Sequence, residues 1–305
     1  MKKIVAIVLV TVLIFPAFLL LKNLFIAHPA KPAAVQTKEE QPVYTPPKRH
    51  VYDIKANYDG KNKLQAKMNL TYVNNTGNTQ KELYFHLYPN MFLSSKRVPF
   101  FKEDFYRAFP QGFSSGCIKI NEIKQDGKDI TWSMMHDDEI LHVTLENPIN
   151  PEEISNIYMQ FELTVPKARF RFGYQTFGND KITMSLGNWY PILAVFKDGQ
   201  WSLDRHQAVG DCTYSDISDY TVSFTVPKDF TVAASGVLKD NHTSDDKAVF
   251  VYSIDKIREF AAAISNNYQT ASEVLDGIKI TSYFHPEDKR GGFMALNVAK
   301  YALAI

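Results

Sequence analysis

The chain has 305 residues, of which 45% are apolar and 13% aromatic, so it can bury a substantial core. This composition excludes a disordered, a collagen-like and a disulfide-dense chain. The 34 lysines and arginines balance 33 aspartates and glutamates and leave a formal net charge of +1. So small a charge provides no field that would steer nucleic acid, and we expect no nucleic-acid partner.

Residues 1–27 form an apolar segment that predicts a transmembrane signal-anchor. Lys2 and Lys3 precede a run from Ile4 to Leu21 without any charged residue. A spanning helix needs about 17–25 apolar residues and the core of a cleaved signal peptide about 7–15, so the length favours an anchor. Because paired lysines keep their end in the cytoplasm, we expect a single-pass protein of the cell membrane with its folded part outside the cytoplasm. The alternative is a signal peptide cleaved near Ala27–Ala30, which would release a secreted protein.

Residues 28–50 contain five prolines and charges of both signs, which predicts a linker. Such a segment cannot bury enough apolar surface to fold, and its prolines favour an extended chain. We expect it to hold the following domain away from the membrane surface.

Residues 51–285 alternate apolar and polar side chains in short runs, as strands with one solvated face do. The runs 51–58 and 64–72 flank an Asp-Gly turn and predict an antiparallel hairpin. Further strands are expected at 83–87, 118–123, 140–145 and 157–165, with an aromatic loop at 100–113 and no helix before residue 184. The expected fold class is mainly β, a large antiparallel β-sandwich or saddle-like domain.

Five pieces of sequence follow one another in order along the chain. They are LYFHLYP at 83–89, GNWYP at 187–191, DYTV at 219–222 with VAASG at 232–236, REFAAAIS at 258–265, and IKI at 278–280 with FHP at 284–286. In this order they resemble the amino-terminal β domain of the membrane alanyl aminopeptidase family of zinc metallopeptidases, the gluzincins. The resemblance covers roughly residues 48–305. It implies a peptide substrate, zinc as the cofactor, and a turn at 187–191 that reaches into the active-site cleft.

The zinc motif of that family is absent from these residues. The family holds its metal with HExxH on a helix and a glutamate further along the chain. No HExxH occurs here, and no two of the eight histidines are four positions apart. His136 and His142 are the nearest imitation, but six residues of straight strand would separate them by about 20 Å. We expect solvated strand-end residues there, and neither a catalytic residue nor a metal ligand in this chain, so that the zinc belongs to the presumed full-length enzyme.

Residues 286–305 predict the first helix of an α-helical catalytic domain. Glu287 and Asp288 suit the positive end of a helix dipole. Four apolar residues then fall at helical spacing, namely Met294, Val298, Tyr301 and Ile305. Since no capping residue follows this stripe, we expect a chain truncated before the catalytic domain, with a naturally short protein as the alternative.

Asn188, Trp189 and Tyr190 are the candidate substrate-binding residues. In many members of the family a Gln or Glu directly before the proline of this turn faces the amine of the substrate, whereas this chain has Tyr190 before Pro191. A neutral hydroxyl binds an ammonium group less strongly than a carboxylate does. Tyr190 is equally suited to line the cleft or to pack in the domain. For Trp189 packing is favoured, because large aromatic side chains are most often buried.

Two functions are consistent with these features. The first is a membrane-anchored, outward-facing zinc aminopeptidase that hydrolyses N-terminal residues from peptides, with this β domain as a wall of the cleft. The alternative is a non-catalytic, membrane-tethered β-sandwich that serves as a binding or scaffold module. Outside the cytoplasm Cys117 and Cys212 would form a disulfide or remain small buried thiols, and the sequence leaves both options open.

Overall fold

A computed structural model of the chain describes residues 49–178, 180–210 and 212–304. The predicted anchor at 1–27 lies outside the described residues, and so does the predicted linker up to residue 48. Within the described part, no helix is both long enough and apolar enough to cross a membrane. The described residues belong to one compact unit.

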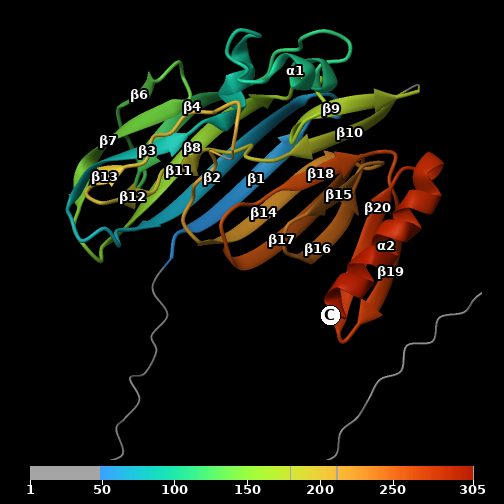
Figure 1. Cartoon of the computed structure of the whole chain (residues 1–305). Helices are drawn as coiled ribbons and strands as arrows, with labels where there is room; N and C mark the ends of the chain where they lie inside the picture. The colour runs from blue at the N-terminus through green and yellow to red at the C-terminus, as the bar shows by residue number, and fades with distance from the viewer. Residues whose placement is uncertain (1–48, 179, 211, 305) are drawn as a thin grey trace, which may run out of the picture. The chain divides into compact units, whose positions relative to one another are not determined.

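The largest sheet has eight strands and confirms that the fold is mainly β (Figure 1). In spatial order the strands are β16 (Val237–Ser244), β17 (Lys247–Ile257), β14 (Ser218–Pro227), β1 (Val51–Tyr58), β2 (Lys63–Val73), β8 (Ile154–Thr164), β4 (Cys117–Gln125) and β5 (Lys128–Asp129). The predicted hairpin is present, because β1 and β2 pair antiparallel. However, β14 pairs with β1 in parallel, so the prediction of an antiparallel sheet is wrong for this pair. The parallel pair arises because the chain returns to the free edge of β1 through a long connection rather than a tight turn.

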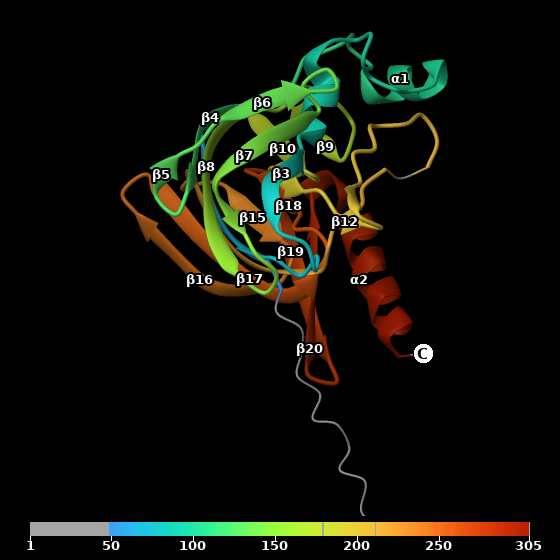
Figure 2. The ribbon, with the colours of Figure 1, turned by 90° about the vertical axis from the view of Figure 1, so that its left-hand side faces the viewer.

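Two four-stranded sheets accompany the large one (Figures 1 and 2). The first consists of β15 (Thr231–Ala234), β18 (Ala262–Ser265), β10 (Lys181–Leu186) and β9 (Phe172–Phe177). The second consists of β11 (Ile192–Leu193), β3 (Gln80–His86), β7 (Ile140–Ile149) and β6 (Trp132–Met135). Two short strands, β12 (Phe196–Lys197) and β13 (Gln200–Trp201), form a separate hairpin.

The core lies on one face of the large sheet. Along β1 and β2 every second residue is buried, and Ile54 and Met68 are fully so. This alternation matches the period of two in the sequence. Trp189 packs against Phe161 of β8 and Phe224 of β14, so the connection after β10 is anchored directly on the large sheet.

Two short helical segments occupy regions where no helix was predicted. A 3₁₀ helix, η1, spans Tyr88–Leu93, and α1 spans Lys102–Ala108 within the expected aromatic loop. Glu103 and Asp104 lie in the first turn of α1 and Arg107 lies in its last turn. These charges match the two ends of the helix dipole. A helix of seven residues is too short to reveal itself by apolar periodicity, which explains the wrong prediction.

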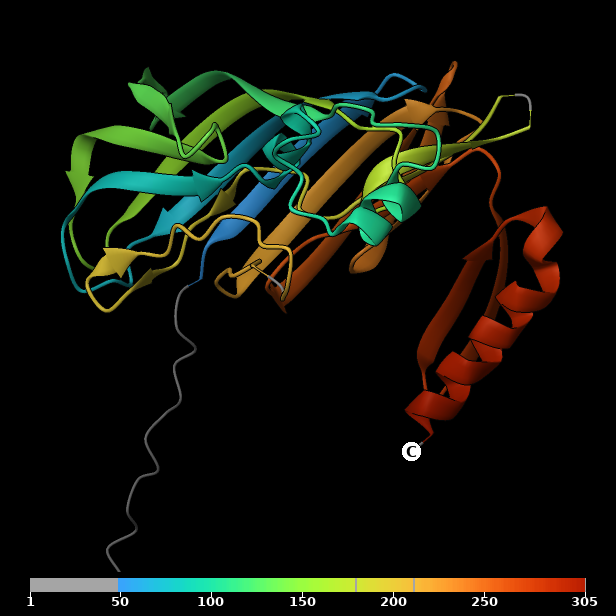
Figure 3. The ribbon, with the colours of Figure 1, turned by 45° about the horizontal axis from the view of Figure 1, so that its top comes forward.

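The final elements are a hairpin and a helix that packs on it (Figure 3). They are β19 (Gln269–Leu275), β20 (Ile278–Phe284), the 3₁₀ segment η2 (Pro286–Asp288) and α2 (Lys289–Leu303). Gly292 permits the close contact, since a Cβ atom there would lie 2.2 Å from the ring of Phe284. The expected helix is therefore present, but Gly292 and Leu296 form its buried side. The described members of the predicted apolar stripe, Met294, Val298 and Tyr301, are exposed.

Candidate functional site

The turn at 187–191 connects β10 to β11 and is tied to the segment that precedes β18. Asn188 has a φ of 52°, in the left-handed region that asparagine tolerates better than most residues. Its Nδ2 donates to Glu259 Oε2 at 2.6 Å, and Trp189 Nε1 donates to the carbonyl oxygen of Phe260 at 3.2 Å. Two consecutive side chains of the turn thus bind two consecutive residues of the other segment.

Tyr190 makes its hydrogen bonds within the core. Its hydroxyl accepts from the backbone N–H of Phe260 at 3.2 Å and donates to the hydroxyl of Tyr220 at 3.1 Å. Tyr220 in turn donates to the carbonyl oxygen of Arg258 at 3.0 Å. Burial raises the pKa of Tyr190 far above the usual range of a phenol. Tyr190 and Trp189 are both fully buried and Asn188 nearly so, which agrees with the packing alternative for the two aromatic residues. Substrate contact by these three residues stays a prediction.

Removing the Tyr190 hydroxyl is expected to destabilise the domain even though the ring remains. In Tyr190→Phe the buried N–H of Phe260 loses its acceptor, and an unsatisfied buried group of this kind costs about 1–3 kcal/mol. Urea unfolding of Tyr190→Phe beside Tyr106→Phe, whose ring is 61% exposed, measures the difference. Equal stabilities of the two variants would show that the Tyr190 hydroxyl contributes nothing to the fold.

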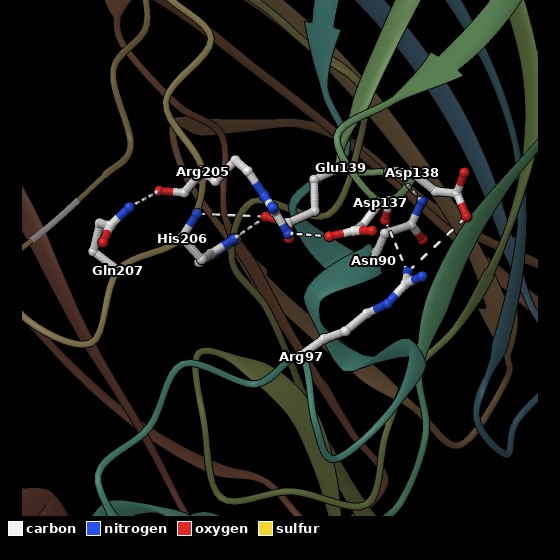
Figure 4. Close-up of polar contacts among 8 residues, drawn as sticks. All are labelled: Asn90, Arg97, Asp137, Asp138, Glu139, Arg205, His206 and Gln207. Atoms are coloured by element: carbon white, nitrogen blue, oxygen red, sulfur yellow. Dashed lines mark hydrogen bonds and ion pairs between the residues drawn. The ribbon is translucent and has the colours of Figure 1, made fainter.

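A buried carboxylate, Glu139, is the centre of a second polar site (Figure 4). Its Oε1 accepts from Arg205 Nη2 at 2.9 Å, and its Oε2 lies 3.4 Å from both the backbone nitrogen and Nδ1 of His206. Arg205 Nη2 also donates to Asp137 Oδ2 at 2.8 Å. We call Asp137, Glu139, Arg205 and His206 the Glu139 cluster. It joins the turn between β6 and β7 to the loop that follows β13.

The turn that carries Glu139 has an unusual backbone. His136, Asp137 and Asp138 have φ values of 50°, 57° and 63°. Asn90 Nδ2 donates to the carbonyl oxygen of Asp138 at 2.6 Å, and Arg97 Nη1 donates to that of Asp137 at 2.8 Å, which stabilises this conformation. The sequence predicted that His136 and His142 are solvated strand-end residues. His136 is exposed and His142 is half-buried, whereas Glu139 between them is buried. The segment is a left-handed turn, the strand begins only at residue 140, and the straight-strand distance between the histidines does not apply.

The neighbours of Glu139 stabilise its ionised form. Burial by itself would raise the pKa of this carboxyl, but hydrogen bonds from His206 and Arg205 outweigh that effect and lower the pKa below its ordinary value. Glu139 is therefore ionised at neutral pH. Because both of its oxygens already accept from cationic or N–H donors, it has little capacity left for use as a general base.

The described residues do not provide a zinc site. No group of three or more His, Cys, Asp or Glu side chains in the described ranges is arranged to hold a metal ion. His142 Nε2 donates to Glu82 Oε2 at 2.9 Å, in a pair rather than a metal-binding triad. His206 faces Glu139, but Arg205 binds the same carboxylate, and a guanidinium in that position opposes a second cation.

Cys117, in β4, is a free thiol and half-buried. The described part of the chain consequently contains no disulfide between Cys117 and Cys212. Of the two alternatives left open by the sequence, the thiol applies to Cys117 in this structure.

Sequence reasoning did not select Glu139, Arg205 and His206 as members of one site. The only local signal is the charged run Asp204-Arg205-His206 beside an aromatic hairpin. Its partner, Glu139, lies 66 residues earlier than Arg205. Nothing in the local pattern of either segment indicates that they meet.

A comparison with known proteins finds similarity among solved structures only. No protein-family model matches the chain, and no curated protein matches it. A solved structure of an M1 zinc metallopeptidase from Deinococcus radiodurans is similar, with 14% identity and a TM-score of 0.49 over 77% of this chain and 46% of that chain. A variant from the same organism bound to a Tyr-Ser-Ala substrate has 14% identity and a TM-score of 0.49, over 81% of this chain and 51% of that chain. The chain spans about half the length of these relatives.

Proposed function

We propose that residues 51–285 form the amino-terminal β domain of a membrane-anchored zinc aminopeptidase. In this proposal the domain walls the cleft in which N-terminal residues are hydrolysed from peptides. The zinc ligands belong to a catalytic part outside the described residues. Residues 1–27 anchor the protein in the cell membrane, with the β domain outside the cytoplasm.

The contact between two of the family-like segments carries the proposal. Gly187–Pro191 and Arg258–Ser265 resemble the family independently, and they are about 70 residues apart in the sequence. Three consecutive side chains of the turn bind Glu259 and Phe260 of the other segment. A turn held in this way by the segment between β17 and β18 is fixed in position, as a wall of a binding cleft needs to be.

Glu259 is the group that we propose for recognition of the substrate amine. Tyr190 replaces the Gln or Glu of the family pattern and its hydroxyl is used in the core. The carboxylate of Glu259 is half-buried and is oriented by Asn188. A carboxylate in this position supplies the negative charge that suits an ammonium group.

The test of this function is the natural coding sequence together with an assay. Beyond Ile305 we expect HExxH, followed roughly eighteen residues later by a glutamate. The full-length protein should release amino acids from peptides with a free amine, lose this activity on zinc chelation and regain it with added zinc. A peptide with an acetylated N-terminus is the matched control, and its hydrolysis at the same rate would contradict an aminopeptidase.

The 305-residue chain by itself should behave differently. Metal analysis is expected to find far less than one zinc per chain, because the described residues lack a ligand set. Tight binding of one zinc per chain would refute this expectation. A coding sequence without the zinc motif would leave the non-catalytic binding module as the function.

A further inference from the structure

A cavity of about 300 Å³ lies beside the Glu139 cluster. His206 and Gln207, both drawn in Figure 4, line one part of it. Arg107 of α1 and the segment that contains Arg169 and Arg171, just before β9, line other parts. This volume is at the lower end of the range typical of small-molecule sites, roughly 300–1,000 Å³. Three separate parts of the chain thus converge on a space large enough for a small ligand.

Basic side chains outnumber acidic ones among the described residues that line the cavity. Arg107, Arg169 and Arg171 line it, and Asp104 is the carboxylate among its described lining residues. Asp104 approaches Arg107 only at 3.5 Å and both side chains are more than half exposed, so this pair neutralises little. Arg169 has no ion-pair partner within the described ranges. Guanidinium groups bind carboxylates and phosphates through two parallel hydrogen bonds, so these side chains favour an oxyanion as the ligand.

His206 is oriented by the protein. Its Nδ1 lies 3.4 Å from Glu139 Oε2, and a carboxylate accepts from an N–H, so Glu139 selects the tautomer with the proton on Nδ1. The other ring nitrogen, Nε2, is not used by Glu139. The ring also packs edge-on against Tyr88, with 5.0 Å between the centroids. The imidazole therefore borders the cavity in a defined orientation.

Part of the remaining lining of the cavity is apolar. Phe100 and Phe170 line it with their ring centroids 4.8 Å apart, and the buried side chain of Met91 lies among the lining residues. The guanidinium carbon of Arg171 is 5.6 Å from the centroid of the Phe170 ring. An anion without an apolar part would leave this surface unused.

We propose that this cavity binds an organic carboxylate with an apolar body. Arg107 and Arg169 bind the carboxylate, and the apolar body packs against Phe100 and Phe170. Either a free carboxylic acid or the C-terminal carboxylate of a peptide presents this chemistry. The site does not depend on peptidase activity, because none of its residues belongs to the turn at 187–191.

Calorimetric titration of the full chain in mild detergent tests the site. The probes are 3-phenylpropionate, as a free acid, and acetyl-Gly-Phe, as a peptide carboxylate. Saturable binding of either probe is expected, and the one that binds more tightly identifies the source of the ligand. The neutral amides of both probes should bind at least about tenfold more weakly, since hydrogen bonds between charged groups are lost. Equal binding of the amides, or of inorganic phosphate, would overturn the proposal.

Matched variants locate the binding in the cavity. Arg169→Gln and Arg107→Gln should each weaken the better probe about tenfold or more. Arg290→Gln removes the same charge from an exposed position on α2, outside the cavity, and should bind as the unchanged chain does. All three positions are exposed, so urea unfolding should give equal stabilities. The site would be refuted if Arg169→Gln and Arg107→Gln bound the probe with unchanged affinity, or if Arg290→Gln lost as much affinity as they do. The absence of saturable binding of either probe would refute it as well.

Discussion

Replacement of Trp189 by alanine is expected to lower the free energy of unfolding by about 4 kcal/mol, within the range of about 3–5 kcal/mol for a large aromatic side chain in a core. The side chain is fully buried and touches rings from two strands of the large sheet, Phe161 and Phe224. Its Nε1 also donates to the carbonyl oxygen of Phe260, which would lose its partner. Much of the cost is the cavity left behind, because strands on several sides prevent the core from collapsing around it.

Urea unfolding, followed by far-UV circular dichroism, measures this loss. Trp132→Ala is the matched control, because that side chain lies in β6 and is 38% exposed. The control should lose clearly less than Trp189→Ala, because more of the Trp132 side chain is in contact with water in the folded state. If Trp189→Ala does not fold, Trp189→Phe keeps most of the volume and should still be less stable than Trp132→Phe. Equal losses at the two positions would place Trp189 outside the core.

Acidification is expected to destabilise the domain well above the pH range in which carboxyl groups titrate. Burial lowers the pKa of His50 to about 4 and that of His86 to about 4, from an ordinary value of 6.5. Between these values the unfolded chain binds a proton at each histidine and the folded chain does not. The contribution of each histidine is therefore fully present above pH 6.5 and is lost as the pH falls towards 4. At about 1.4 kcal/mol per pH unit, each histidine would cost about 3 kcal/mol near pH 4.

The contacts of the two rings agree with their neutral forms. His50 Nδ1 accepts from the backbone N–H of Val73 at 3.2 Å, so a proton on this nitrogen would break that bond. Asp216 lies 4.0 Å from His50 but is half exposed, and its attraction does not compensate for burial. His86 donates from Nε2 to the carbonyl oxygen of Ser202 at 3.1 Å, a bond that the neutral ring already makes.

Urea unfolding at a series of pH values between 7 and 4 measures directly how the free energy of unfolding depends on pH. His50→Gln and His86→Gln should each remove about half of the loss of stability between pH 6.5 and 4, whatever their effect at pH 7. His242→Gln is the matched control, because that side chain is 56% exposed. Glu139 contributes to the pH dependence at lower pH. Because its pKa is lowered on folding, its contribution to the free energy of unfolding is lost as the pH falls below the range in which an ordinary carboxyl group titrates. A stability that is constant from pH 7 to 5 would contradict the role of both histidines.

Interactions within one strand or one turn could be predicted from the sequence. The hairpin of β1 and β2 follows from alternation with a period of two around Asp59-Gly60, and the structure contains this antiparallel pair. The helix after residue 286 was likewise indicated by its acidic first turn and apolar spacing. Which side of that helix is buried was not, because Gly292 rather than the apolar stripe meets Phe284.

The environment of each candidate residue could not be predicted. Tyr190 was equally suited to a cleft or a core, and packing was favoured for Trp189 on its size alone. The burial of both side chains depends on Phe161, Phe224 and Tyr220 from distant strands. Glu139 is a charged residue next to two aspartates, a context that predicts a solvated surface. It is buried because Arg205 and His206 arrive from a loop more than 60 residues later.

By itself the sequence determined the β class, the hairpin and the absence of HExxH, since each depends on residue type at short separation. Only the tertiary structure decided that the turn at 187–191 is packed against the segment before β18. It also decided that Glu139 is buried beside a cavity lined by arginines. The physical reason is the same in both cases: burial and charge pairing depend on partners that the chain brings together over 60 to 70 residues, and no local pattern encodes them.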